Sequence, residues 1–451
     1  MFNIEKIREE FPITKQHFKV YGSDEPRNLI YFDHGASTHP PLRVITKYTD
    51  FLYNYYSNVH RGKHNLSVIS TELFDNVYEI IFNFIHADKQ ENAVILTSNT
   101  TTALDICASV MSEIDGITLV SLMEHHSNDL PHRNRGKVVH FGLNPDGSID
   151  MNDFEMKLKQ NKVKLIAVTA ASNVTGFMPD IHRIAKLAHE NGAKILVDAA
   201  QMIAHKEIDV KPNSDDTHLD FIAGAGHKAY APFGSAFLFG PKNILDNATP
   251  YIPGGGTVIY VTTEDVFFDK SPDRHQGGTP NIGGAIAFAE SLKFLSLVGL
   301  DDIREHEIEL TEYALGKLKS LNGIDLLGNI PANQRLGVIS FNAGELNNNL
   351  VSMILNDEAA IATRNGCFCA HPYLHFLLGL SDTTELRAKL ALGEDVELPG
   401  AVRISFGIYN TKEEVDELIK MLKIIMNKKW DTNYEQSFST KTCKEIISNL
   451  I

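Results

Sequence analysis

The sequence predicts an α/β fold with a large, mainly parallel sheet covered by helices, followed by a smaller α+β C-terminal domain. Between residues 93 and 240, short apolar runs alternate with helical patterns, as in the strand and helix repeats of parallel sheets. Runs such as KILVDAA and LDFIAGA are apolar throughout, which is typical of strands buried on both faces. From about residue 323 the pattern changes to strand-like runs at 335–342 and 401–406, and a Thr411–Glu414 capping box predicts a final helix.

Two helices are expected in the chain before the alternating region. Residues 1–28 predict a short amphipathic helix and then a polar loop. The next segment, 28–37, contains an apolar run that ends at Asp33. A helix is expected after Pro40-Pro41, because proline is tolerated in the first turn of a helix.

Seven strands and the helices between them are expected in the alternating region. One of these helices has Asp180 as its predicted N-cap and Gly192 just beyond its end. The Gly-rich segment 250–283 predicts a long irregular loop of the functional kind, and helical patterns return at 284–299 and 301–322. The expected strands span residues 93–98, 117–123, 137–141, 164–173, 194–200, 219–225 and 234–240.

Composition and charge exclude several classes of function. The formal net charge is -15 and no run is rich in Lys or Arg, so nucleic acid is not an expected partner. No apolar stretch approaches the length of a membrane span, and the N-terminus lacks the pattern of a signal peptide. Four cysteines in 451 residues are too few for a disulfide framework. A cytoplasmic enzyme that does not bind membranes is therefore expected.

An acid and an amine follow two of the predicted strands. Asp198 ends one run and Lys228 follows another, and ligands of open α/β sheets bind beyond the carboxyl ends of strands. A Lys that forms a Schiff base and an Asp that pairs with a pyridinium nitrogen are the protein groups that hold pyridoxal 5'-phosphate. The alternative is a plain buried ion pair or a surface lysine.

Other polar groups at strand ends fit the same cofactor. Thr100 and Thr101 lie where a strand meets a helix start, and exposed N–H groups and hydroxyls there form a phosphate cradle. His125 follows another strand, where its ring could lie flat on a pyridine, and Asn173 and Gln201 could bind the phenolic oxygen. Each residue also has a purely structural interpretation, as a helix cap or a satisfied core side chain.

The segment RNGCFCA contains two thiols and is the remaining candidate for a reactive site. Cys367 and Cys369 lie beside a glycine, with Arg364 five residues before Cys369, and positive charge increases thiolate reactivity. The alternative is that both cysteines are small apolar fillers. A metal site is not expected, because the sequence offers no second pair of ligands.

Nine motifs occur in the order found in class V, fold-type I pyridoxal phosphate enzymes, and the chain most closely resembles the cysteine desulfurase and selenocysteine lyase-like group. The resemblance runs from about Tyr31 to Tyr409, and VHRGKHNLS and the combination of EHH, DAAQ and GHK are its most specific parts. The motifs are YFDHGAS, VHRGKHNLS, MEHHSNDLP, ASNVTG, VDAAQ, AGHKAY, GGTPN, RNGCFCA and VRISF.

The resemblance implies a cysteine desulfurase that releases sulfur from L-cysteine as an enzyme persulfide and forms alanine. It implies catalytic roles for Lys228, Cys369 and His125. It also implies a homodimer, in which Gly278 and Thr279 reach the phosphate of the neighbouring subunit, and it makes a sulfur-acceptor protein a candidate partner. The implied cofactor-binding residues are Lys228, Asp198, Gln201, His125, Thr100, Thr101, Asn173, His227, Gly278 and Thr279. The implied substrate-binding residues are Arg403, Arg364, His60 and Asn173.

The chain departs from the family pattern in ways that leave other reactions open. Ala225 stands where Ser or Thr usually contacts phosphate, Cys367 replaces a common His, and the segment between Cys369 and Arg403 is longer and more acidic than expected. The alternatives are C–S or C–Se β-elimination, amino transfer, sulfuration of molybdenum cofactor, or a scaffold without activity. A nicotinamide-binding module is disfavoured, because the glycine run 254–256 lacks the required spacing.

These assignments divide the chain into four parts. Residues 1–28 form the N-terminal helix and loop, and 29–300 form the large domain that binds pyridoxal phosphate. Residues 301–428 form the small C-terminal domain. The tail, 429–451, has no predicted structure except a short periodic piece near Cys443.

Overall fold

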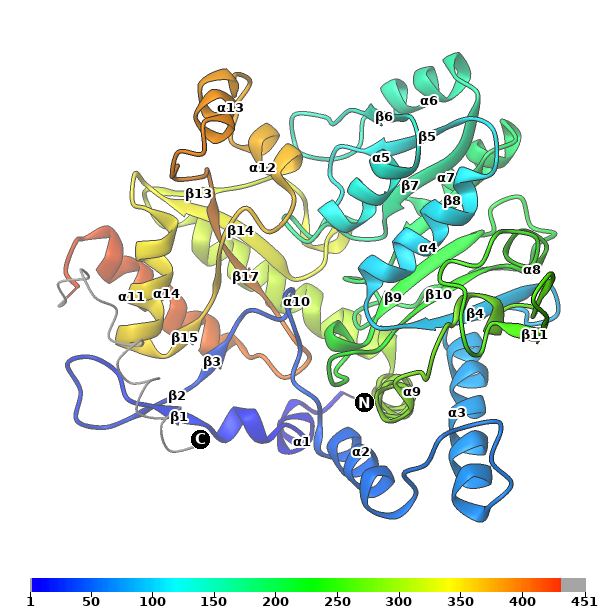
Figure 1. Ribbon diagram of the computed structural model, residues 1–451. Helices are drawn as coiled ribbons and strands as arrows, with labels where there is room; N and C mark the ends of the chain where they lie inside the picture. The colour runs from blue at the N-terminus through cyan, green and yellow to red at the C-terminus, as the bar shows by residue number, and fades with distance from the viewer. Residues whose placement is uncertain (1, 431–451) are drawn as a thin grey trace.

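The computed structural model describes residues 2–430, in which a large α/β unit lies beside a smaller α+β unit (Figure 1). The large unit contains all seven predicted strands in one sheet, in the order β4-β10-β9-β8-β7-β5-β6. All neighbouring strands in it are parallel except β10, which is antiparallel to both β4 and β9. The predicted fold class is therefore confirmed. The strands are β4 (Asn92–Thr97), β5 (Ile117–Ser121), β6 (Val138–Phe141), β7 (Val163–Thr169), β8 (Lys194–Asp198), β9 (Phe221–Ala225) and β10 (Ala236–Pro241).

Helices cover both faces of the sheet, as the apolar strands require. In β8, Leu196 packs in one apolar cluster with Leu104 of α4, whereas Ile195 and Val197 pack in another with Ile184 of α7. Successive residues of a strand point to opposite faces, so both faces are buried. The helices of this unit are α2 (Leu42–Asn54), α3 (Asn65–Phe84), α4 (Thr100–Ser112), α5 (Leu130–Arg135), α6 (Met151–Gln160), α7 (Ile181–Glu190), α8 (Lys242–Leu245) and α9 (Ile282–Val298).

Predicted helix ends agree with the structure. The side chain of Asp180 accepts a hydrogen bond from the N–H of Arg183 at 3.0 Å, and Gly192 has a φ of +73° just beyond α7. The capping box is also present, because Thr411 and Glu414 each accept a hydrogen bond from the other residue's backbone N–H at the start of α14.

The small unit is a four-stranded sheet, β13-β14-β17-β16, packed against helices. Its apolar cluster unites Leu310 of α10, Leu355 of α11, Ile404 of β17 and Leu418 of α14. Its elements are α10 (Leu300–Lys319), β13 (Ile324–Leu326), β14 (Val338–Ala343), α11 (Asn348–Ala359), β15 (Ile361–Ala362), β16 (Arg364–Gly366), α12 (His371–Leu377), α13 (Thr384–Ala391), β17 (Ala401–Ser405) and α14 (Lys412–Met426).

The residues at the predicted start of the large domain contact the small unit. Strand β3 (Ile30–Tyr31) pairs in parallel with β15, and Ile30 and Phe32 are buried in the apolar cluster of the small unit. Residues 30–32 therefore pack with the small unit, and none of them pairs with a strand of the seven-stranded sheet. The first segment contains α1 (Ile4–Glu9) and the strands β1 (His17–Phe18) and β2 (Arg27–Asn28).

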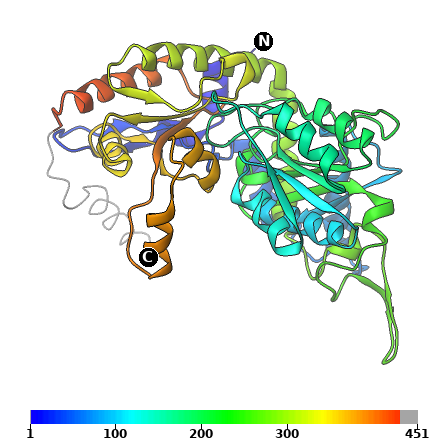
Figure 2. The ribbon, with the colours of Figure 1, turned by 90° about the horizontal axis from the view of Figure 1, so that it is seen from above.

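The Gly-rich segment is not wholly irregular, contrary to the prediction. Within it, β11 (Val258–Val261) and β12 (Val266–Phe268) form an antiparallel hairpin that extends beyond the body of the molecule (Figure 2). Exposed apolar side chains such as Ile259, Tyr260 and Phe267 belong to this hairpin. The sequence does not predict this hairpin, because its strands are too short to show a periodic pattern and glycines lie beside them.

Two helices fill the long segment between Cys369 and Arg403. Helix α12 begins two residues after Cys369, and α13 projects away from the small unit (Figures 1 and 2). The periodic piece predicted near Cys443 lies outside the described residues. Within the described residues, no single helix has the length and apolarity to cross a membrane; the bent pair of α9 and α10 meets that test only when taken together.

Candidate active site

A cavity of about 250 Å³ lies at the carboxyl ends of β5, β7, β8 and β9, between the large and small units. Parallel strands direct their carboxyl ends to the same edge of a sheet, so residues distant in sequence converge there. The cavity brings together eleven of the predicted site residues. They are Thr100, Thr101, His125, Asn173, Asp198, Gln201, His227, Lys228, Arg364, Cys369 and Arg403.

Lys228 and Asp198 line this cavity from neighbouring strands. Burial lowers the pKa of Lys228 to about 8, although the charge of Asp198 opposes the shift. Burial raises the pKa of Asp198, whereas a hydrogen bond from the N–H of Ala200 at 3.0 Å and the charge of Lys228 act in the other direction. The amine is therefore neutral at a much lower pH than an exposed lysine, as nucleophilic chemistry requires.

The amino end of α4 presents unpaired donors to the cavity. The N-cap Asn99 accepts a hydrogen bond from the N–H of Thr102 at 2.9 Å, and the N–H groups of Thr100 and Thr101 have no acceptor within the helix. The hydroxyl of Thr100 is buried and has no hydrogen-bond partner among the described residues. Such an orphaned hydroxyl beside free N–H groups at the positive end of a helix dipole fits a phosphate group.

His125 is held as a neutral ring at the wall of the cavity. Its Nδ1 accepts a hydrogen bond from the N–H of Ser127 at 3.1 Å, which leaves the proton of the neutral ring on Nε2. Burial, followed by the charge of Lys228, lowers the pKa of His125 to about 3. The same two causes lower the pKa of His227 to about 4. Both imidazoles are therefore uncharged at neutral pH.

Arg403 is fixed by acceptors on its two terminal nitrogens. Its guanidinium donates to Asp33 Oδ1 at 3.0 Å and to the carbonyl oxygen of Asn173 at 3.0 Å. The side chain is 3% exposed, yet its Nε has no hydrogen-bond partner among the described residues. A buried guanidinium with an unused N–H fits a carboxylate ligand. Arg364 lies opposite Arg403 in the antiparallel pairing of β16 and β17 and adds a second positive charge.

The Cys369 loop is held in an unusual backbone conformation. Phe368 and Cys369 have φ values of 55° and 54°, in the left-handed region that residues other than glycine rarely adopt. The side-chain amide of Asn173 donates to the carbonyl oxygen of Phe368, and the N–H of His126 donates to that of Cys369, both at 2.7 Å. These contacts maintain the strain and leave the thiol of Cys369 exposed.

Gln201 occupies the same wall, where its amide donates to the carbonyl oxygen of Gly35 at 2.8 Å. Gly35 lies so close to Arg403 that a Cβ atom there would be 3.2 Å from the guanidinium carbon. A larger residue at position 35 would therefore displace Arg403.

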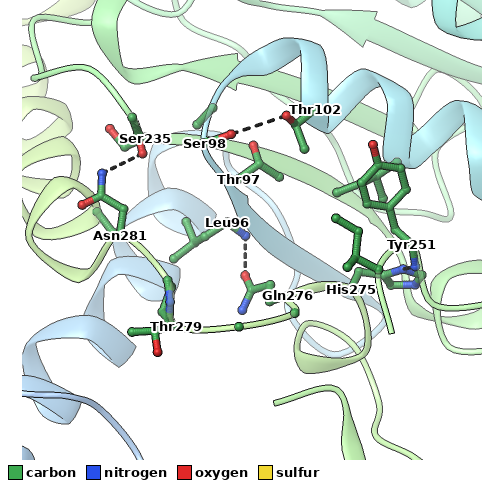
Figure 3. A pocket seen from close by; sticks show the side chains of 18 of the residues that line it. Leu96, Thr97, Ser98, Thr102, Ser235, Tyr251, His275, Gln276, Thr279 and Asn281 are labelled. Atoms are coloured by element: carbon green, nitrogen blue, oxygen red, sulfur yellow. Dashed lines mark hydrogen bonds between the residues drawn. The ribbon is translucent and has the colours of Figure 1, made fainter. Parts of the chain in front are cut away.

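Three predicted site residues do not line this cavity. His60 forms an exposed pair with Asp75 at 2.8 Å. Gly278 and Thr279 line a separate cavity of about 240 Å³ (Figure 3). Phe74 lines this second cavity and its ring centroid is 5.9 Å from that of His60. The three residues therefore lie at or beside this second cavity, which Lys228 does not line.

Sequence reasoning missed two residues that shape the site. The sequence identifies Asp33 only as the end of an apolar run, although it pairs with Arg403 370 residues away in the chain. It does not identify Phe368, although the Arg403 guanidinium lies 5.0 Å from the ring centroid of this residue. Neither contact has a local sequence signal; the acidic residue in YFDHGAS was the one available clue.

Comparisons with known proteins agree with this geometry. Residues 30–418 match the family model for class V aminotransferases. A probable cysteine desulfurase of Halalkalibacterium halodurans is 35% identical over 431 residues, which cover 93% of this chain and 97% of that protein. A cysteine desulfurase of Haloferax volcanii is 31% identical over 92% of this chain and 95% of its own length.

A solved structure gives the same result. The apo structure of a cysteine desulfurase from Thermococcus onnurineus superposes with a TM-score of 0.82 at 30% identity, covering 94% of this chain and 98% of that one. The matches extend over nearly the full length of each relative, so they include both units of the fold. The chain therefore belongs to the class V aminotransferase family of pyridoxal phosphate-dependent enzymes, in the group of the cysteine desulfurases.

Proposed function

We propose that this enzyme is a cysteine desulfurase that transfers the sulfur of L-cysteine to Cys369 and releases alanine. The observation that carries the proposal is the thiol of Cys369 on the same cavity as Lys228, Asp198 and Arg403. The relatives named as cysteine desulfurases support it, because they match the chain over both units.

The residues of the cavity fit pyridoxal phosphate, the cofactor of this family. Thr100, Thr101 and His227 would hold its phosphate, since Thr100 offers an unpaired hydroxyl. Asp198 would hold a proton on the ring nitrogen, and His125 would cover one face of the ring. Gln201 and Asn173 would lie near its phenolic oxygen. When bound, the cofactor supplies an electron sink for charge that develops at the substrate Cα.

The basic residues would orient the substrate and move its proton. Arg403, already fixed by Asp33, would bind the substrate carboxylate through its unused N–H, with Arg364 adding positive charge at the mouth of the cavity. This contact would place the substrate Cα near the Lys228 amine, which can accept its proton because burial favours the neutral form. His125, uncharged at neutral pH, would exclude water from one side of the reacting carbon.

Cys369 would accept the sulfur. As the thiolate attacks, a bond forms between Cys369 Sγ and the substrate sulfur, and the substrate C–S bond breaks with its electron pair left on carbon. Protons are then returned to the substrate carbons, so that cysteine and one enzyme thiol give alanine and one enzyme persulfide. Arg364 would favour the thiolate, since nearby positive charge lowers a thiol pKa. A thiol on an acceptor protein would then remove the sulfur.

A homodimer would complete the site. Gly278 and Thr279 line the second cavity, and His60 lies beside it, so all three are available to the site of a partner subunit. In that arrangement Gly278 and Thr279 would reach the partner's cofactor phosphate and His60 its substrate. We further place the enzyme in the cytoplasm, where free thiols such as Cys369 remain reduced.

Product analysis with a Cys369→Ser variant tests this function. We expect the variant to retain cofactor absorbance but to lose alanine formation from L-cysteine by at least 100-fold, because no thiol accepts sulfur. Cys367→Ser is the matched control, since it removes the other thiol of the same loop, and its alanine formation should stay near the wild-type rate. Wild-type activity in Cys369→Ser, or pyruvate and ammonia as the main wild-type products, would refute the proposal.

A further inference from the structure

Two histidines and a carboxylate form a cluster at the opposite end of the sheet from the active site. His189 lies in the last turn of α7, and His218 and Asp220 lie just before β9. One potential ligand atom from each of the three residues lies within 4.8 Å of the others. His189 Nε2 is 2.9 Å from Asp220 Oδ2, and His218 Nε2 is 3.3 Å from Asp220 Oδ1.

Both imidazoles are oriented by backbone carbonyl groups. His189 Nδ1 lies 2.8 Å from the carbonyl oxygen of Asp216, and His218 Nδ1 lies 2.6 Å from that of Asp215. A carbonyl oxygen only accepts, so each Nδ1 carries a proton, and in the neutral rings the lone pairs are on the two Nε2 atoms. The rings stack at a centroid distance of 4.2 Å, and both Nε2 atoms face the carboxylate of Asp220.

Because an ionised carboxylate only accepts, each Nε2 atom facing Asp220 needs either a proton or a metal ion between the two atoms. The pattern of an Nδ1–H donated to a carbonyl, with Nε2 left free, is that of metal-ligating histidines. The side chains are 15% exposed for His189, 13% for His218 and 2% for Asp220, so the cluster is shielded but reachable from solvent.

Lys194 already supplies one positive charge to the cluster. Its ammonium lies 2.7 Å from Asp220 Oδ1, but its side chain is 38% exposed and can swing into water. The other Asp220 oxygen accepts the N–H of Ile195 at 3.0 Å, which fixes the carboxylate. Lys186, which pairs with Asp216, is a further charged group near the two rings, and Glu190 and Asp215 act on its charge.

We propose that His189, His218 and Asp220 bind a divalent transition-metal ion of the Zn²⁺ class. Imidazole nitrogen and carboxylate oxygen suit such ions, and Zn²⁺ bonds of about 2.0–2.2 Å place tetrahedral ligand atoms roughly 3.3–3.5 Å apart. The two Nε2 atoms now lie 2.9 and 3.3 Å from different oxygens of Asp220, and the ligand atoms of the three residues lie within 4.8 Å of one another, so the side chains would move together around the ion. Lys194 moves away on binding, and water takes the fourth position.

The ion would act as a structural clip rather than as part of the desulfurase reaction. It would join the end of α7 to the start of β9, and β9 leads directly to Lys228. The strand is five residues long, so the cluster lies on the order of 15–20 Å from the cavity. Loss of the ion is therefore expected to lower the stability of the fold and to leave catalytic turnover at low temperature unchanged.

Calorimetric titration with Zn²⁺ tests this site. The holoenzyme is used without an affinity tag, in a background where Cys367, Cys369 and Cys443 are serine, because thiolates also bind zinc. At pH 8 we expect one equivalent of Zn²⁺ to bind and to raise the midpoint of thermal unfolding. His218→Ala should weaken binding at least 30-fold and abolish the rise in midpoint.

A matched control and a spectroscopic readout separate this site from other zinc contacts. His86 pairs with the single carboxylate of Glu207 without a second imidazole, so His86→Ala should bind Zn²⁺ as the parent does. Co²⁺ bound to the parent should give the visible bands of a tetrahedral ion, and His218→Ala should lose them. The proposal is overturned if the parent binds no Zn²⁺, or if His218→Ala leaves affinity, midpoint and Co²⁺ spectrum unchanged.

Discussion

Arg403 illustrates how single residues define the site. Its guanidinium is buried, which costs free energy unless its donors are paired, and Asp33 and Asn173 satisfy two of them. The Nε of Arg403 has no hydrogen-bond partner among the described residues and would donate to a substrate carboxylate. Asp33 is therefore a positioning residue, because it acts on the substrate through Arg403.

Asp33→Asn should raise the KM for L-cysteine by about 10-fold, with a smaller effect on kcat. The amide keeps the shape of the side chain but loses the charge-assisted hydrogen bond, which contributes about 1.5–3 kcal/mol and orients Arg403. Steady-state kinetics measure the change. Asp115→Asn, which alters an exposed pair with Lys162, is the control and should behave as wild type. An unchanged KM in Asp33→Asn would contradict the positioning role.

Cofactor attachment should follow the lowered pKa of Lys228. Burial disfavours the ammonium, so the neutral amine that bonds the cofactor appears around pH 8 instead of near the ordinary lysine pKa of about 10.4. The rate of attachment to apoprotein should rise through that pH. The charge of Asp198 raises the pKa of Lys228, so Asp198→Asn should move the inflection to lower pH. Stopped-flow absorbance measures it, and a shift to higher pH would contradict the assignment.

At the scale of elements, the loop between β16 and α12 has a strained backbone that hydrogen bonds from other parts of the chain hold in place. Left-handed conformations at residues other than glycine cost about 1–3 kcal/mol each, and Phe368 and Cys369 are adjacent examples. The side chain of Asn173 is one tether, and it comes from the end of β7 in the other unit. The loop therefore depends on contact between the two units.

Asn173→Ala should slow persulfide formation about 10-fold while Lys228 still bonds the cofactor. Without the amide, the loop can relax and Cys369 spends less time in the reactive position, whereas the carbonyl contact to Arg403 remains. Single-turnover measurements of persulfide and absorbance of the bound cofactor separate the two effects. A normal rate of persulfide formation in this variant would show that the tether is dispensable.

Thr411→Ala should lower the free energy of unfolding by about 1 kcal/mol, because it removes the N-cap of α14. Urea denaturation monitored by circular dichroism measures the loss. Thr49→Ala is the control: this hydroxyl bonds to a carbonyl oxygen within α2, and alanine is favoured in a helix, so stability should stay the same or rise. Equal losses in the two variants would contradict the capping role.

Elements with local signals were predictable, and elements defined by distant contacts were not. The seven sheet strands and the Asp180 and Thr411 caps follow from apolar runs and polar stop signals within a few residues. The β11–β12 hairpin and the placement of β3 beside β15 depend on pairings that no local pattern encodes. The same limit applies to Asp33 and to the His189–His218–Asp220 cluster, whose members are not spaced as a ligand motif.

At the scale of the whole molecule, the active site lies where the two units meet. The large unit contributes Lys228 and Asp198 from strand ends, and the small unit contributes Arg403 from β17 and Cys369 from the loop after β16. Relative movement of the units would therefore change the distance between the amine and the thiol. Gly278, Thr279 and His60 lie outside this junction, where the proposed second subunit would bring them to its own site.

The enzyme should sediment as a dimer of twice 50.2 kDa. Thr279→Ala should weaken cofactor binding about 5–10-fold, although Thr279 does not line the cavity of its own Lys228, because it would serve the partner's phosphate. Thr262→Ala, on the exposed turn of the nearby hairpin, is the control. A monomer that binds the cofactor fully would contradict this arrangement.

The central claim is that Cys369 receives the sulfur, and mass spectrometry after one turnover tests it most directly. Cys367→Ser holoenzyme is mixed with one equivalent of L-cysteine, quenched without reductant and digested. The account predicts that the peptide containing Cys369 gains the mass of one sulfur atom while one equivalent of alanine appears. Alanine formed with no added sulfur on that peptide, or sulfur found elsewhere in the chain, would contradict it.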